Sequence, residues 1–91
     1  MMDGFSIKVK MNDGFEKTYV LSPKVIVGFE SKYGKGFGKL LEEMRYEHFC
    51  YLAWKSLHAD GIVVKPFNGP EQAGFLDDIA EAELVIEDSF G

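Results

Sequence analysis

Histidine, cysteine and carboxylate side chains near the middle of the chain are the residues best suited to catalysis or metal binding. Cys50 follows His48 by two residues, but two such neighbours on a helix point in different directions and do not form a nucleophile–base pair. His48 and His58 lie about three helical turns apart, which is too far for them to share one metal ion. We therefore interpret Cys50 as a buried structural residue and predict no metal site.

Two other patterns suggest chemistry only superficially. Residues 35–39 (KGFGK) precede a predicted helix, where backbone N–H groups can hold a phosphate, but the Walker spacing and a following Ser or Thr are absent. Two pairs of carboxylates are adjacent in sequence, Glu42 with Glu43 and Asp77 with Asp78. Adjacent side chains point in different directions, so we interpret both pairs as solvent-exposed surface residues. We predict a non-enzymatic protein with no catalytic residue and no cofactor.

Composition and charge limit the remaining classes of fold and function. Ninety-one residues make one domain, and 46% hydrophobic with 14% aromatic residues is enough to build a core. Residues 1–41 hold seven lysines against four acidic residues, whereas residues 42–91 hold three basic against eleven acidic residues. This acidity argues against nucleic acid as a partner, because phosphate neutralisation drives such binding.

The single cysteine and the lack of a leader or membrane-spanning run predict a soluble, cytoplasmic protein without a membrane partner.

The first element predicted is a β-hairpin over residues 5–21. Apolar and polar residues alternate on both sides of Asn12-Asp13-Gly14, the period-two pattern of half-buried strands. A three-residue loop closed by Gly14 pairs Lys10 with Glu16, whereas a two-residue loop places Lys10 opposite Lys17. Opposite charges favour the first register, so we predict the three-residue loop.

Helices are predicted over residues 22–33, 39–59 and 70–82. Ser22-Pro23 is a helix start, Gly34 ends the first helix, and residues 34–38 form a flexible joint. Residues 84–86 fit either an edge strand or a helix end, and residues 87–91 a flexible tail. The predicted class is α+β: an N-terminal β-hairpin packed on a bundle of three helices, of which the central one, about 39–59, is the longest.

Residues 49–54 (FCYLAW) are apolar or aromatic on every side of the predicted central helix, although a helix packed on one face needs only a stripe. Either the rest of the domain surrounds this helix completely, or one face of the helix is reserved for another chain. A domain of this size has little chain with which to bury the whole run. We therefore expect the protein to self-associate. We assign Phe29, Phe49 and Leu52 to the core. The predicted protein-binding residues are the aromatic side chains Tyr33, Phe37, Tyr51 and Trp54.

An ordered set of short motifs resembles the small tail assembly chaperones of long-tailed bacteriophages. The set comprises the hairpin with Asn-Asp-Gly, Ile-Val-x-Phe-Glu-x-x-Tyr-Gly-Lys-Gly at 26–36, Leu-Ala-Trp-Lys-x-Leu-His at 52–58 and Gly-x-Val-Val-x-Pro-Phe at 61–67. The likeness covers about residues 7–87. It implies a protein that binds the hydrophobic, helical tape measure protein in the host cytoplasm, assists tail-tube assembly and is absent from the mature virion. The tail tube protein is a second implied partner.

Two other classes fit the same residues. One is a structural tail or head-completion protein that uses the apolar helix for permanent oligomerisation. The other is a small regulatory protein that presents its acidic C-terminal end to a basic partner.

Overall fold

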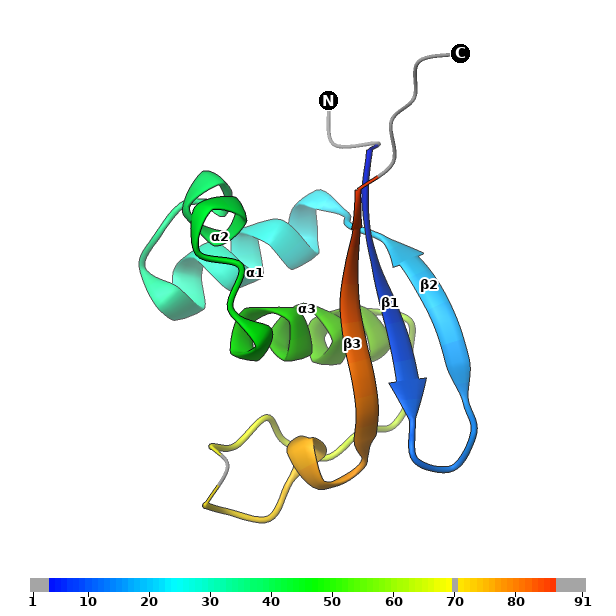
Figure 1. Ribbon diagram of the computed structural model, residues 1–91. Coiled ribbons are helices and arrows are strands. Elements are labelled where there is room, and N and C mark those ends of the chain that lie inside the picture. Colours follow the sequence, from blue (N-terminus) through cyan, green and yellow to red (C-terminus); the bar gives the residue numbers. More distant parts are fainter. Residues whose placement is uncertain (1–3, 70, 87–91) are drawn as a thin grey trace.

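The protein is described by a computed structural model that covers residues 4–69 and 71–86. A three-stranded antiparallel sheet in the order β2-β1-β3 forms one layer, and three α-helices form the other (Figure 1). The α+β class and the N-terminal hairpin are confirmed. The predicted tail at residues 87–91 lies outside the described residues.

The hairpin adopts the predicted register. Strand β1 (Phe5–Met11) pairs with β2 (Glu16–Val20), with Lys10 opposite Glu16. Gly14 has a φ of 99°, the left-handed conformation that the three-residue loop requires, and the Met11 N–H donates to the Phe15 carbonyl.

Helix α1 (Pro23–Tyr33) also agrees with its prediction. The Ser22 hydroxyl caps its first turn by accepting from the Val25 N–H, and Gly34 ends it with a φ of 66°. The apolar face of α1 is buried through Val25, Ile26 and Phe29.

The predicted helix at 39–59 is wrong as a single element. The chain forms α2 (Phe37–Glu43) and α3 (Tyr46–Ala59), and Met44 between them has a φ of 51°. The Glu30 carboxylate accepts the Phe37 N–H at 3.0 Å at the start of α2. The break lets the short α2 bury Phe37 and Leu40 while α3 runs in another direction, so tertiary packing overrides a sequence that favours one continuous helix.

The predicted helix at 70–82 is also wrong. Over residues 71–78 the chain forms only a 3₁₀ turn at Phe75–Asp77, and strand β3 (Ile79–Ile86) follows it. The edge-strand reading of residues 84–86 is therefore the correct alternative. Strand β3 pairs with the free edge of β1, which places Glu83 opposite Lys8 and Glu81 opposite Lys10.

The sheet is amphipathic, and its apolar face packs against the helices. Ile7 and Val9 of β1 are fully buried, and Ala82 and Leu84 of β3 lie on the same face. The opposite face carries a ladder of lysine and glutamate side chains, in which Lys8 and Glu16 form an ion pair at 3.2 Å that raises the lysine pKa. No described helix covers that charged face (Figure 1).

Replacing Met44 by glycine should stabilise the fold. Left-handed backbone costs a non-glycine residue about 1–2 kcal/mol, of which the greater freedom of glycine in the unfolded chain offsets about half. Met44 is exposed, so little packing is lost. We expect urea denaturation of Met44→Gly to show a free energy of unfolding about 0.5–1 kcal/mol above the parent. Met44→Ala is the matched control, because it removes the side chain but keeps the strain. A Met44→Gly variant no more stable than Met44→Ala would contradict this account.

Candidate protein-binding groove

Three of the four predicted binding residues lie together on the structure. The ring centroids of Tyr33 and Tyr51 are 5.6 Å apart, and those of Tyr51 and Trp54 are 5.7 Å apart. Phe37 is elsewhere: it is buried and packs edge-on against Phe5 at 5.5 Å. The helix break at Met44 explains this separation, because α2 carries Phe37 to the sheet.

Phe67, which the sequence did not single out, completes this aromatic cluster of Tyr33, Tyr51, Trp54 and Phe67. Its ring centroid lies 5.3 Å from that of Tyr51 and 6.1 Å from that of Trp54. Tyr51 is only 6% exposed, whereas Tyr33 and Trp54 are half-buried. The cluster therefore lies at the edge of the core and is partly exposed. Its contact with another protein stays a prediction.

The indole of Trp54 anchors the segment that follows α3. Its N–H donates to the Lys65 carbonyl at 2.8 Å. The connecting segment, described at residues 62–69 and 71–74, has no regular secondary structure there and is held further by a hydrogen bond from the Phe75 N–H to the Pro66 carbonyl. The Lys65 ammonium pairs with Asp78 at 3.4 Å. These contacts fix the connecting segment opposite the turn of the hairpin.

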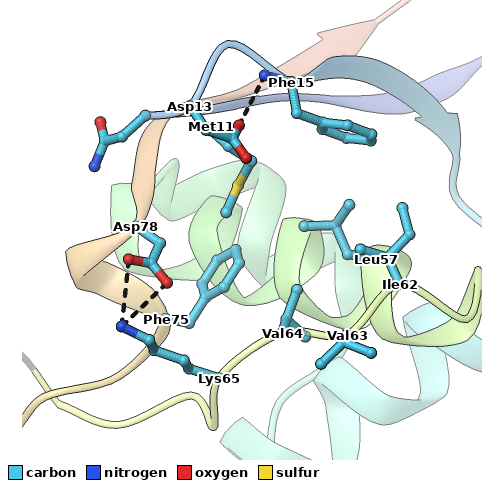
Figure 2. A pocket seen from close by; sticks show the side chains of 11 residues that line it. Met11, Asp13, Phe15, Leu57, Ile62, Val63, Val64, Lys65, Phe75 and Asp78 are labelled. Atoms are coloured by element: carbon cyan, nitrogen blue, oxygen red, sulfur yellow. Dashed lines mark hydrogen bonds and ion pairs between the residues drawn. The ribbon is translucent and has the colours of Figure 1, made fainter.

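A groove of about 560 Å³ opens between the hairpin turn and the start of the connecting segment (Figure 2). This volume falls within the ~300–1,000 Å³ of typical ligand-binding clefts. The residues that line it are Met11, Asn12, Asp13, Phe15, Leu57, Ile62, Val63, Val64, Lys65, Phe75 and Asp78.

The groove has an apolar floor and a polar rim. Leu57 and Phe75 form part of the floor and are buried, whereas Val63 on one wall is 97% exposed. Asp13 and the Lys65–Asp78 ion pair stand at the edge (Figure 2). An exposed valine beside a buried apolar floor is an arrangement suited to an apolar partner.

Sequence reasoning missed most of this groove. Leu57 and residues 62–64 appear there only within the motifs at 52–58 and 61–67, and no sequence pattern brings them to the hairpin turn. The only signal was the run Ile62-Val63-Val64 immediately after a helix end, with no second apolar strand nearby in sequence to cover it.

His48 and Cys50 are both buried. His48 is 1% exposed and packs edge-on against the rings of Phe29 and Tyr33, and its Nδ1 has no hydrogen-bond partner among the described residues. Burial lowers its pKa, and Lys35 and Arg45 lower it further. Burial also raises the pKa of Cys50 to about 11, so its thiol stays protonated near neutral pH.

Burial likewise raises the pKa of the Tyr33 hydroxyl, which donates to Glu47 at 3.3 Å. Within residues 4–69 and 71–86, no three His, Cys, Asp or Glu side chains gather as a metal site. The described helices include none that is long and apolar enough to cross a bilayer.

Removal of the Trp54 N–H should loosen the connecting segment. A hydrogen bond of this kind contributes about 0.5–1.5 kcal/mol, so we expect Trp54→Phe to lower the free energy of unfolding by about that amount or more, because ring area is lost too. Chemical denaturation followed by circular dichroism measures the change. Tyr51→Phe is the comparison, because it removes only the longer 3.4 Å bond to the Gly28 carbonyl. An equal or smaller loss in Trp54→Phe would contradict the anchoring role.

His48 should make the fold less stable in mild acid. Its folded pKa lies below the unfolded value of about 6.5, so the unfolded chain binds more protons between the two values. The stability that neutral His48 contributes to the fold is complete above pH ~6.5 and is lost as the pH falls toward the pKa of the folded state. We expect His48→Leu to show a shallower decline of unfolding free energy than the parent between about pH 7 and 5. Parallel declines in the two proteins would refute this assignment.

Comparisons with known proteins leave the chain without a match: no family model, no curated protein and no solved structure matches it.

Proposed function

We propose that this protein is a phage tail assembly chaperone that binds the hydrophobic, helical tape measure protein and assists tail-tube assembly without catalysis. In this proposal it acts in the host cytoplasm, self-associates and leaves before the virion is mature. The tail tube protein is its second partner.

The groove is the observation that carries the proposal. A chaperone for a helical client needs an apolar depression into which amphipathic segments of the client lay their apolar faces. The groove offers buried floor residues, an exposed Val63 and a polar rim. A client held there keeps its apolar side chains from water and from other clients.

The position of the family-like motifs also supports the proposal. The stretch at 52–58 lies on α3 and the stretch at 61–67 begins the connecting segment. Trp54 of the first binds the Lys65 carbonyl of the second, and Leu57 lies in the floor beside Val63 and Val64. The two most characteristic pieces of the resemblance thus build one groove together.

Co-expression with the tape measure protein of the same phage tests the proposal. We expect the tape measure protein to be soluble with the parent chain and mostly insoluble without it. Val63→Ser should remove most of this effect while leaving the fold intact, because Val63 is 97% exposed and contributes little to the core.

Val20→Ser is the matched control, since Val20 is also exposed, at 66%, but does not line the groove. It should solubilise the client as the parent does. A tape measure protein that precipitates in the presence of the parent would contradict the chaperone function. Presence of the protein in fixed number in purified virions would favour the structural alternative.

A further inference from the structure

We infer that the groove binds an amphipathic α-helix whose apolar ridge is flanked by lysine or arginine. This inference rests on the proposed function in taking a helical client as the occupant. It adds the charge that must flank the apolar ridge of the client segment.

The form of the groove fits a ridge of side chains. Its floor is apolar and lies between two walls, the hairpin turn with Met11 and Phe15, and the connecting segment with Ile62 and Val64 (Figure 2). Apolar residues spaced i, i+3 or i+4 and i+7 on a helix form one such ridge. The volume of about 560 Å³ gives room for several side chains from one ridge.

An added β-strand fits less well. Residues 62–65 take part in no ladder of the described sheet, so the backbone groups there that are not already hydrogen-bonded are open to a partner strand. However, Gly61 precedes them with a φ of 83°, and Pro66 follows them without an N–H. Pairing is limited to about four residues, shorter than the usual strand of five or six. A helix would instead pack its side chains against the apolar floor of the groove and would not need this short edge.

The charges on the rim favour a basic partner. Asp13 stands at the hairpin turn, and no cationic side chain of residues 4–69 or 71–86 forms an ion pair with it. Its Oδ1 accepts the Phe15 N–H, and its side chain is exposed. Lys65 at the opposite wall is already paired with Asp78. The rim therefore carries a net negative charge, which attracts lysine or arginine beside the apolar ridge.

Binding of synthetic peptides to the full chain tests this inference. The probe is a helix-forming peptide of about 15–18 residues with a leucine ridge flanked by lysines, long enough for measurable helix. A second peptide replaces the lysines by glutamates, and a third carries two prolines within the ridge. Titration calorimetry at low salt should show the basic helix binding about tenfold or more tightly than the acidic one, and no binding of the proline peptide.

Asp13→Asn isolates the charge. Asparagine keeps the Oδ1 acceptor for the Phe15 N–H, so the turn is preserved. It should weaken the basic peptide several-fold at low salt, with the difference fading at high salt. Glu42→Gln is the control, because Glu42 is exposed and lies outside the groove lining. It should bind as the parent does.

Several results would overturn the inference. Equal affinity for the basic and acidic peptides, or no effect of Asp13→Asn, removes the charge argument. Binding of the proline peptide shows that the occupant is extended. Affinity that weakens as the protein concentration rises shows that a second copy occupies the groove.

The inference and the proposed function can fail separately. If the basic helix binds in the groove but the tape measure protein stays insoluble, the occupant is identified and the chaperone function is wrong. If the tape measure protein is solubilised and Asp13→Asn and Val63→Ser have no effect, the function holds and the groove is not its site.

Discussion

The packing of α3 against three different elements determines most of this structure. Each contact includes one aromatic hydrogen bond: the Tyr46 hydroxyl accepts the Ala82 N–H of β3, the Tyr51 hydroxyl donates to the Gly28 carbonyl of α1, and the Trp54 indole donates to the Lys65 carbonyl. The remaining sides of α3 meet the core through Leu52, Ala53 and Leu57, all buried. A helix enclosed in this way needs apolar residues all round, which accounts for the run at 49–54 without reserving a whole face for another chain.

Local signals were sufficient for the hairpin and α1. A turn glycine, opposite charges across the strands and a serine–proline start each act within a few residues, so the register and the helix ends could be derived. The break at Met44 could not, because no glycine or proline marks it and the reason is distant packing of Phe37 against Phe5. Strand β3 did carry a signal: Glu81 and Glu83 alternate with the buried Ala82 and Leu84. The helix propensity of alanine and glutamate concealed it.

The candidate site was only partly predictable from the sequence, because its aromatic residues can be recognised locally but its groove is built by contacts distant in sequence. Tyr33, Tyr51 and Trp54 stand out by type, and they do gather with Phe67. The groove, by contrast, depends on residues about fifty positions apart in sequence, since the hairpin turn and residues 62–65 meet only after β3 pairs with β1. Its chemistry is plain once assembled: buried leucine and phenylalanine below, an exposed valine on the wall, and a carboxylate at the edge.

Amide hydrogen exchange of the chain, alone and in complex with the tape measure protein, is the most direct test of the groove as the client site. Within residues 62–65, the backbone N–H groups of Val63, Val64 and Lys65 donate to no acceptor among the described residues, so they exchange readily in the free chain. We predict that the client slows exchange at these residues and at the hairpin turn, residues 11–15, more than on the charged face of the sheet. Protection confined to the charged face or to α2, with residues 62–65 unchanged, would contradict the account.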